Sequence, residues 1–331
     1  MKITVLGSGG WGTAVAILLC DNGHEVTLWS HDETKANAME RTRENPLLPG
    51  VHLHDRISVT ADISCVTDAE TVVFASPSFA LRPVARLASP HLSEGVSLVS
   101  LTKGIEKDSH RRMSEILREE TGDRFPIVVL SGPSHAEEVA RRLPTGCVAA
   151  STDRRAAERI QDAFMNGNFR VYTSPDVVGV ELCGATKNVI ALCCGISDGL
   201  GFGDNTKALL MTRAMHELTR LGEKLGGKRA TFSGLAGMGD LIVTCTSMHS
   251  RNRRAGILIG QGKSVEDACR EVGAVVEGYF AAASVRSLAR EVGINMPICT
   301  AAYEVLYAGA DAREKLGELM QRAKNEETAW R

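Results

Sequence analysis

Lys187 is the residue of this sequence best suited to exchange a proton. It lies in residues 184–191, Gly-Ala-Thr-Lys-Asn-Val-Ile-Ala, where most neighbours are small or apolar. A lysine in a helix buried on nearly all sides must pair with another group or serve a purpose, because an unpaired buried charge is costly. Burial also lowers the pKa of an ammonium group, which allows acid–base chemistry near neutral pH. A solvated surface lysine is the ordinary alternative.

Asp240 is the second candidate, and it follows a glycine-rich segment. Residues 234–245 read Gly-Leu-Ala-Gly-Met-Gly-Asp-Leu-Ile-Val-Thr-Cys. One interpretation holds the carboxylate beside a cationic group in a site. The other makes Asp240 the cap of the next helix.

Ser250, Arg251 and Asn252 begin a predicted helix and suit the capture of a phosphate. The guanidinium offers a fork of donors, and the helix N-terminus offers free N–H groups. The alternative is a solvated basic turn, and this is the interpretation that we give to Arg253 and Arg254. Glu277, in Val-Val-Glu-Gly-Tyr (275–279), reads without further context as an acidic helix start.

The first thirty residues predict where a dinucleotide would bind. Residues 2–6 read as a buried strand, an apolar helix follows over 13–20, and a second strand covers 25–29. Between the first strand and the helix, Gly7, Gly9 and Gly12 form G-x-G-x-x-G. Gly7 makes the tight turn, Gly9 lets a pyrophosphate approach the backbone, and Gly12 packs helix on strand. A glycine-rich turn without a ligand is the alternative.

Strands and helices keep alternating up to residue 178. This pattern predicts a mainly parallel sheet covered on both faces. The further strands are expected at 71–75, 96–101, 125–130, 147–150 and 169–172, and the helices at 79–89, 108–121, 135–142 and 153–165. Ligands collect beyond the carboxyl ends of such strands, where small or polar residues stand at 30–31, 76–78, 102–104 and 132–134.

The pattern changes from residue 179 onward, where no strand is predicted. The expected helices lie near 180–199, 205–225, 252–261, 264–272, 278–292, 297–308 and 311–323, followed by a frayed tail over 325–331. The predicted fold class is therefore α/β plus all-α. A Rossmann domain with a doubly wound, mainly parallel sheet covers 1–178, and an all-helical substrate-binding domain covers 179–331.

Composition narrows the class of protein. The chain has 331 residues and a net charge of −2, which gives no electrostatic case for nucleic acid or an anionic membrane. Met1 and Lys2 run into a strand and leave no room for a signal peptide. The longest apolar runs, such as 14–20, are too short to span a bilayer. Nine cysteines without a C-x-x-C predict reduced thiols and no metal site. We expect a soluble, cytoplasmic protein.

In order, these motifs resemble the NAD(P)-dependent glycerol-3-phosphate dehydrogenases of the bacterial type. The resemblance covers nearly the whole chain and goes far beyond a shared glycine turn. The matching segments are Gly-Ser-Gly-Gly-Trp-Gly-Thr-Ala (7–14), Leu-Thr-Lys-Gly-Ile-Glu (101–106), Leu-Ser-Gly-Pro-Ser-His-Ala-Glu-Glu-Val-Ala (130–140), Gly-Ala-Thr-Lys-Asn-Val-Ile-Ala (184–191), Gly-Leu-Ala-Gly-Met-Gly-Asp-Leu-Ile-Val-Thr-Cys-Thr-Ser (234–247), Ser-Arg-Asn-Arg-Arg (250–254) and Val-Val-Glu-Gly (275–278).

The resemblance implies an oxidoreductase that interconverts dihydroxyacetone phosphate and sn-glycerol 3-phosphate for phospholipid synthesis, with NADPH or NADH as cofactor. It implies a homodimer and makes Lys187 the catalytic proton donor and acceptor. The implied substrate-binding residues are Lys103, Gly132, Ser134, Lys187, Asp240, Ser250, Arg251 and Asn252. The implied cofactor-binding residues are Gly7, Gly9, Gly10, Trp11, Gly12, His31, Lys103, Ala136, Arg251, Val275 and Glu277.

Three positions depart from the family pattern. His135 stands where the family often has Phe, Phe79 where a polar residue is usual, and Thr186 where Leu is commoner. None of them removes a charged or hydrogen-bonding group that the resemblance assigns.

The end of the second strand bears on cofactor choice. NAD enzymes often place an acidic residue there to bind the ribose 2′-hydroxyl, but this chain has Ser30 and His31, with Asp32 one step further. Ser and His can accept a 2′-phosphate. We therefore expect both cofactors to work, with a preference for NADPH.

Two other functions compete with this interpretation. A β-hydroxyacid or 6-phosphogluconate type dehydrogenase also joins a Rossmann domain to helices and uses a Lys–Asn pair, as residues 187–188 would allow. The segments at 234–240 and 250–254 argue against it. A non-enzymatic sensor that binds NAD(P) without turnover is the more distant alternative.

Overall fold

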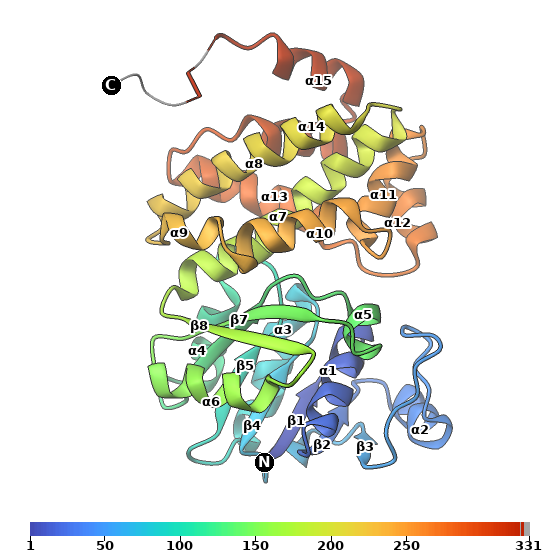
Figure 1. The fold of residues 1–331 in the computed structure, drawn as a ribbon, viewed down its shortest axis with the longest axis vertical. Coiled ribbons are helices and arrows are strands. Elements are labelled where there is room, and N and C mark those ends of the chain that lie inside the picture. The colour runs from blue at the N-terminus through green and yellow to red at the C-terminus, as the bar shows by residue number, and fades with distance from the viewer. Residues whose placement is uncertain (325, 328–331) are drawn as a thin grey trace.

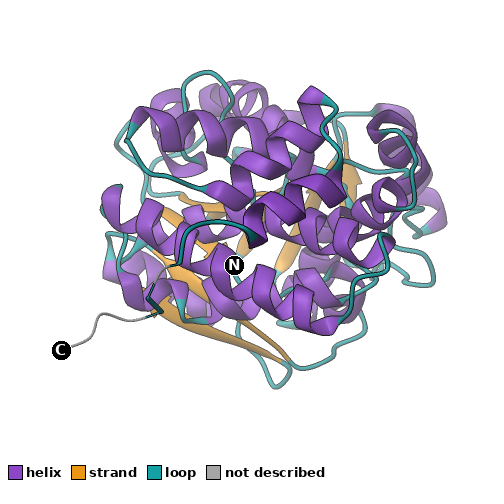
Figure 2. Ribbon diagram, turned by 90° about the horizontal axis from the view of Figure 1, so that it is seen from above, coloured by secondary structure: helices purple, strands orange, loops and turns teal. Residues whose placement is uncertain are grey.

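The computed structural model divides into a sheet half (residues 1–174) and a helical half (residues 177–320). In Figure 1 the sheet half lies at the bottom and the helical half at the top. The structure describes residues 1–324, 326 and 327. Most of the tail that the sequence predicts to be frayed, 325–331, therefore lies outside the described residues. Seen from above, helices lie across the sheet (Figure 2).

Within the described part of the chain, eight strands form one sheet in the order β3-β2-β1-β4-β5-β6-β7-β8. All neighbours are parallel except β6 and β7, which are antiparallel. The predicted fold class, with its mainly parallel sheet, is thus confirmed. The strands are β1 (Lys2–Leu6), β2 (Glu25–Trp29), β3 (Ile57–Thr60), β4 (Thr71–Phe74), β5 (Ser97–Ser100), β6 (Ile127–Ser131), β7 (Thr145–Ala150) and β8 (Phe169–Ser174).

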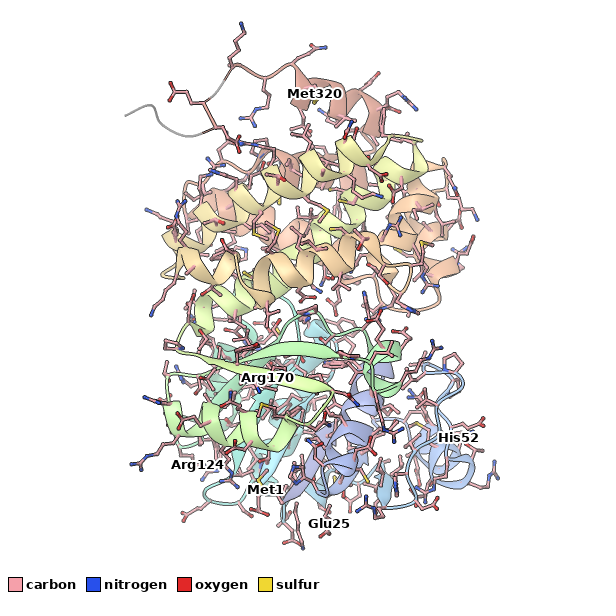
Figure 3. The ribbon with its side chains drawn as sticks, in the orientation of Figure 1. Met1, Glu25, His52, Arg124, Arg170 and Met320 are labelled. Atoms are coloured by element: carbon pink, nitrogen blue, oxygen red, sulfur yellow. The ribbon has the colours of Figure 1, made fainter. Side chains whose placement is uncertain are left out.

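The strand order reverses at β1, which pairs with β2 on one side and β4 on the other. In open sheets of this kind, ligands bind outside the carboxyl ends of the strands at such a reversal. Met1, just before β1, and Glu25, at the start of β2, lie at the end of the molecule away from the helical half (Figure 3). The carboxyl ends therefore face the helical half, and the glycine turn follows β1 at this point.

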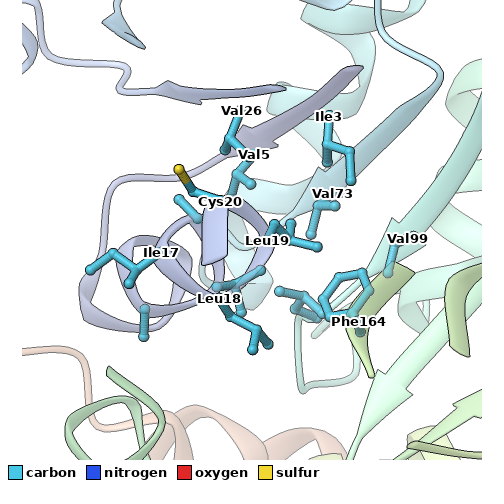
Figure 4. Close-up of a cluster of buried hydrophobic side chains, with 14 of the residues drawn as sticks. Ile3, Val5, Ile17, Leu18, Leu19, Cys20, Val26, Val73, Val99 and Phe164 are labelled. Carbon is cyan, nitrogen blue, oxygen red and sulfur yellow. The ribbon is translucent and has the colours of Figure 1, made fainter. Parts of the chain in front are cut away.

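Alternation along β1 supplies both faces of the sheet with core residues. Ile3 and Val5 pack in one cluster with α1 (Gly10–Asp21) and with Phe164 of α6 (Arg154–Phe164), as Figure 4 shows. Leu6 points to the opposite face, where it packs with α3 (Ser78–Ala88) and α4 (Met113–Thr121). Burying one such side chain stabilises the fold by about 1.5–3 kcal/mol.

The helical half is built around α7 (Val177–Gly199). The helix is long and apolar enough to cross a membrane, but 83% of its most apolar window is buried inside the protein. It is longer than the run at 14–20, but Glu181, Lys187 and Asn188 interrupt it, so the helix contains no continuous apolar run long enough to span a bilayer. Burial by the neighbouring helices explains its composition, because a helix packed on all sides reads as apolar all round.

Glycines let α7 and α11 (Arg251–Gly260) cross at very short range. A Cβ on Gly195 would lie 2.1 Å from the carbonyl oxygen of Arg253, and one on Gly256 would lie 2.2 Å from that of Leu192. No larger side chain fits without moving a backbone. The crossing fixes where the N-terminus of α11 lies relative to Lys187 on α7.

The other helices of the chain surround this pair or cover the sheet. They are α2 (Glu33–Thr42), α5 (Ala136–Ala140), α8 (Asp204–Lys224), α9 (Arg229–Phe232), α10 (Asp240–Thr246), α12 (Val265–Val272), α13 (Glu277–Glu291), α14 (Pro297–Ala308) and α15 (Ala312–Met320), with short turns η1 (Ile63–Val66) and η2 (Ser89–His91) and a π-helical turn η3 (Leu235–Gly239). The predicted domain boundary between 178 and 179 falls in the first turn of α7 and stays a prediction.

Several elements were absent from the sequence prediction. The helix α2 buries only Ala36 and Met39, so it shows little hydrophobic periodicity, and β3 is a four-residue edge strand. The helix predicted over 108–121 begins only at Met113, because the preceding turn contains His110 with a positive φ of 54°. The elements α9 and η3 were also missed, since the glycines at 234, 237 and 239 indicate a loop, and α10 was raised only as the alternative in which Asp240 caps a helix.

Gly256→Ala should lower the free energy of unfolding by about 1–3 kcal/mol, the usual cost of overpacking, because the added methyl group overlaps the α7 backbone. Gly317→Ala in α15 is the matched control, since its Cβ would meet nothing within 4 Å. That control should raise stability by about 0.4–1 kcal/mol. Urea unfolding of both variants measures the difference. Equal effects in the two variants would contradict the close crossing.

Candidate active site

Asp240 reaches the site because the chain folds tightly just before it. A Cβ on Gly237 would lie 2.2 Å from the carbonyl oxygen of Phe232, so this turn requires a glycine. Asp240 is the first residue of α10, but its carboxylate does not cap that helix; the N-cap position is Gly239. The side chain is free to make other bonds, and it is 1% exposed.

The Asp240 carboxylate bridges two lysines from the two halves of the molecule. Lys187 Nζ on α7 donates to Oδ1 at 2.5 Å. Lys103 Nζ, from the loop after β5, donates to Oδ2 at 2.6 Å. One buried carboxylate therefore holds a cation from the sheet half beside a cation from the helical half.

This arrangement shifts the protonation of both buried groups. Burial lowers the pKa of the Lys187 ammonium to about 8; Asp240 opposes this by stabilising the charged form, and Lys103 adds to the lowering. Burial alone would raise the pKa of the Asp240 carboxyl, but Lys103 and Lys187 together hold it below its ordinary value. Lys187 can thus lose and regain a proton near neutral pH while Asp240 stays ionised.

Thr244 fixes the direction of the Lys187 ammonium. Lys187 Nζ donates to Thr244 Oγ1 at 2.7 Å, and that hydroxyl donates onward to the Asp240 carbonyl oxygen at 2.6 Å. Two of the three ammonium donors are thereby occupied, which leaves one for a bound molecule. Thr244 was missed by the sequence interpretation, although its spacing of four residues from Asp240 places both side chains on one face of a helix.

The glycine turn after β1 has the shape that a pyrophosphate needs. Gly7 has φ of +129°, and a Cβ there would lie 2.8 Å from the Ala75 carbonyl carbon. A Cβ on Gly12 would lie 1.9 Å from the Gly7 carbonyl oxygen, whereas one on Gly9 would meet nothing within 4 Å. Gly9 is also the N-cap of α1 and makes no side-chain cap. Gly9 therefore leaves room for a ligand at the N-terminus of α1, where backbone amides suit phosphate oxygens.

Buried hydroxyls at the strand ends also fit a bound dinucleotide. Among the described residues, Ser76 after β4 and Ser131 at the end of β6 have buried hydroxyls without a hydrogen-bond partner. Trp11 and Ala136 are half-buried and pack against the core beside the turn, and a Cβ on Gly10 would lie 2.9 Å from the Leu47 carbonyl oxygen. Two buried hydroxyls at the described strand ends thus lack a hydrogen-bond partner that a bound molecule could supply.

Gly132 and Ser134 follow β6 and lie beside Lys103. The Gly132 carbonyl oxygen accepts from Lys103 Nζ at 3.2 Å and from Ser134 Oγ at 2.9 Å. Gly132 has φ of +155°, and a Cβ there would lie 2.8 Å from the Gly146 carbonyl oxygen. This carbonyl and the Asp240 carboxylate hold Lys103 in place.

At the N-terminus of α11, three predicted phosphate-binding residues differ in their surroundings. Ser250 Oγ caps the helix by accepting from the Arg253 amide at 3.2 Å. Asn252 Nδ2 donates to Asn188 Oδ1 at 3.0 Å, and Asn252 Oδ1 accepts from the Gly278 backbone amide at 2.8 Å. Arg251 is exposed. Arg254, in the same turn, is half-buried and its Nε has no hydrogen-bond partner in the described part of the chain, so Arg251 is the exposed cation at this helix end.

Arg253 is not the solvated residue that the sequence indicates. Its guanidinium donates to Asp198 Oδ2 at 2.7 Å, and its side chain is 14% exposed. The bond ties α11 to the end of α7, so it serves the fold.

Glu277 and Val275 lie at the start of α13, and Glu277 joins the two halves a second time. Its carboxylate accepts from the Ser78 amide at 3.2 Å and from Ser78 Oγ at 2.7 Å, at the N-terminus of α3. Burial raises the pKa of Glu277, and the bonds from Ser78 oppose this. Val275 is half-buried, whereas His31 is exposed beyond the end of β2.

The three departures from the family pattern have local partners. Thr186 Oγ1 donates to the Leu182 carbonyl oxygen at 2.6 Å, within α7. The Phe79 ring lies 6.1 Å from that of Phe280, across the two halves. His135 approaches the Val243 carbonyl oxygen at 3.4 Å, and burial followed by the charge of Lys187 lowers its pKa.

A glycine turn at a strand-order reversal is typical of a dinucleotide-binding domain, and the buried lysine held by an aspartate adds a group that can exchange a proton. Comparison with known families specifies the class. Residues 2–157 match the family model for the N-terminus of NAD-dependent glycerol-3-phosphate dehydrogenase, and residues 176–316 match that for its C-terminus. The chain belongs to the NAD-dependent glycerol-3-phosphate dehydrogenase family.

Individual relatives agree with this placement. The chain is 51% identical over 327 residues to the glycerol-3-phosphate dehydrogenase [NAD(P)+] of Desulfitobacterium hafniense, covering 98% of this chain and 93% of the relative. It is 53% identical over 328 residues to the glycerol-3-phosphate dehydrogenase [NAD(P)+] of Moorella thermoacetica, and the match covers 98% of this chain and 97% of the relative. The crystal structure of glycerol-3-phosphate dehydrogenase from Coxiella burnetii is 36% identical, with a TM-score of 0.94, and the match covers 97% of this chain and 99% of that one.

Replacement of the Thr244 hydroxyl tests how Lys187 is held. Thr244→Val should lower kcat about 10- to 100-fold, because a hydrogen bond to a charged group stabilises by roughly 1.5–3 kcal/mol. In the wild type the reduction rate should fall above about pH 8 as Lys187 loses its proton, and this limb should move to lower pH in the variant.

Thr246→Val is the matched control. Thr246 makes the same type of intrahelical bond, to the Ile242 carbonyl oxygen at 2.8 Å, but is exposed and touches no lysine. Its pH–rate profile should follow the wild type. A Thr244→Val profile that coincides with the control would contradict the role of the hydroxyl.

Proposed function

We propose that this chain reduces dihydroxyacetone phosphate to sn-glycerol 3-phosphate with NADPH or NADH, and that Lys187 supplies the proton. The observation that carries the proposal is the buried ammonium of Lys187, held by Asp240 and Thr244 with one donor to spare. Membership of the NAD-dependent glycerol-3-phosphate dehydrogenase family supports the reaction and the cofactor class.

The chemistry requires a cation where negative charge develops. The reduced nicotinamide, when bound, supplies a hydride to the C2 carbonyl carbon of the substrate. Lys187 then stabilises the developing charge on the carbonyl oxygen and donates a proton to it, which completes the alcohol. Asp240 keeps the lysine charged and aimed, and Lys103 adds a second positive charge across the same carboxylate.

The phosphate group of the substrate is assigned to the N-terminus of α11. Arg251 supplies the guanidinium. The backbone amides at this helix end add hydrogen-bond donors, and the positive end of the helix dipole also favours an anion. Ser250 and Asn252 support this site by capping α11 and by tying it to α7 and α13. Binding energy gathered on the phosphate, away from C2, positions the carbonyl for reaction.

The proposal also includes the other residues that the sequence predicts to contact the substrate or the cofactor. Gly132 and Ser134 contact the substrate with Lys103, and the cofactor lies along Gly7, Gly9, Gly10, Trp11, Gly12, His31, Ala136, Val275 and Glu277. The homodimer and the cytoplasmic location are also proposals, and both rest on the resemblance to the family. A supply of glycerol 3-phosphate for phospholipid synthesis is the corresponding role.

Lys187→Met should lower kcat for dihydroxyacetone phosphate reduction about 10²- to 10⁴-fold, the usual contribution of a general acid. The loss of NAD(P)H absorbance measures the rate. Binding of NADPH, followed by fluorescence, should remain, since the variant leaves the glycine turn intact. Turnover near the wild-type rate would overturn the assignment of Lys187.

Arg251→Met should raise KM for dihydroxyacetone phosphate about 10- to 100-fold, as expected for the loss of a charged hydrogen bond. Arg253→Met is the control from the same turn: it should lower the thermal midpoint, because Asp198 loses its partner, and leave KM unchanged. An unchanged KM in Arg251→Met would place the phosphate elsewhere.

A further inference from the structure

Lys35 extends its side chain from α2 to the glycine turn. Its Nζ donates to the Ser8 carbonyl oxygen at 2.8 Å, and Ser8 lies between the first two glycines of the turn. The residue is half-buried. A cation therefore lies between the end of β2 and the turn, where the adenosine ribose of a dinucleotide is bound in sheets of this kind.

The acidic residue nearest to this place is engaged elsewhere. The Asp32 carboxylate caps α2 by accepting from the Lys35 amide at 3.0 Å. Ser30 is buried, and its hydroxyl accepts from Ser8 Oγ at 2.8 Å. A carboxylate that binds the two ribose hydroxyls is the feature that favours NAD, and here Asp32 Oδ1 already caps the helix.

The Lys35 ammonium can turn to a ligand at little cost. The Ser8 carbonyl oxygen also accepts from Asn45 Nδ2 at 3.0 Å, so it keeps a partner when Lys35 moves. In the part of the chain that the structure describes, no ion pair includes Lys35, although Glu33 and Asp32 lie on the same turn. Burial lowers the pKa of Lys35 and the charge of Asp32 opposes this. A half-buried cation without an ion pair gains most from a dianionic partner.

We propose that Lys35 binds the 2′-phosphate of NADPH and gives this chain a preference for NADPH over NADH. The inference rests on the proposed function only in that the cofactor is a nicotinamide dinucleotide. His31, four residues before Lys35 in the chain, is exposed and offers a ring N–H donor as well. A 2′-phosphate would accept hydrogen bonds from the Lys35 ammonium in place of the Ser8 carbonyl oxygen. An uncharged 2′-hydroxyl would leave the bond from Lys35 to Ser8 in place.

The test is direct binding to three variants of the full chain, followed by protein fluorescence. Lys35→Met removes the charge and keeps the stem, Lys35→Arg keeps the charge, and Lys224→Met removes an exposed lysine of α8 as a control. NADPH binding should weaken about 10- to 100-fold in Lys35→Met, the scale of a charged hydrogen bond, while NADH binding is unchanged. Lys35→Arg and Lys224→Met should bind both cofactors as the wild type does.

Adenosine 2′,5′-bisphosphate and adenosine 5′-monophosphate serve as probes that need no turnover. The first should bind more tightly than the second to the wild type, and Lys35→Met should abolish that difference. Equal loss of NADPH and NADH binding in Lys35→Met, or no loss of either, would overturn the proposal. A wild type that binds the bisphosphate in this way but does not oxidise NADPH with dihydroxyacetone phosphate would leave Lys35 in place and refute the proposed reaction.

Discussion

The Asp240 carboxylate between Lys103 and Lys187 is the interaction on which the site depends. A buried charge is tolerated only with partners, and removing one partner of a buried ion pair costs about 3–5 kcal/mol. Here the partners come from the loop after β5 and from α7, at 2.6 and 2.5 Å. The same bonds that neutralise the carboxylate therefore hold the two halves of the molecule in register, and they set the protonation of the lysine to which we assign the chemistry.

Close backbone approach makes this meeting possible. Gly184, one turn before Lys187, lets α7 lie against Lys103, since a Cβ there would be 3.3 Å from Lys103 Cγ. A Cβ on Gly278 would lie 2.4 Å from the Asn188 carbonyl oxygen, so α13 also meets α7 directly. The glycine crossing of α7 with α11 completes the set. Around Lys187, small residues thus bring backbones together, and polar side chains satisfy the groups that burial strips of water.

Where hydrophobic patterning is strong, the fold was predictable from sequence. The alternation of β1, α1 and β2 and the apolar length of α7 both indicate their elements directly. Two of the missed elements lack this signal: α2 buries two residues, and η3 contains Gly237, whose turn is fixed by the backbone of Phe232. The site divides in the same way. Lys187 and Asp240 stand out by residue type, but Thr244, Ser78 and Lys35 acquire their partners only through tertiary contacts. Arg253 looked solvated because its partner, Asp198, is 55 residues away.

Titration of the Lys187 side chain in the wild type and in Asp240→Asn, by nitrogen NMR of labelled lysines assigned with Lys187→Arg, tests the central claim most directly. The account predicts a midpoint near the pKa of about 8 in the wild type. It predicts a lower midpoint in Asp240→Asn, because burial and Lys103 then act on the ammonium without the opposing carboxylate. A wild-type midpoint at the ordinary lysine value, or one that Asp240→Asn leaves in place, would contradict it.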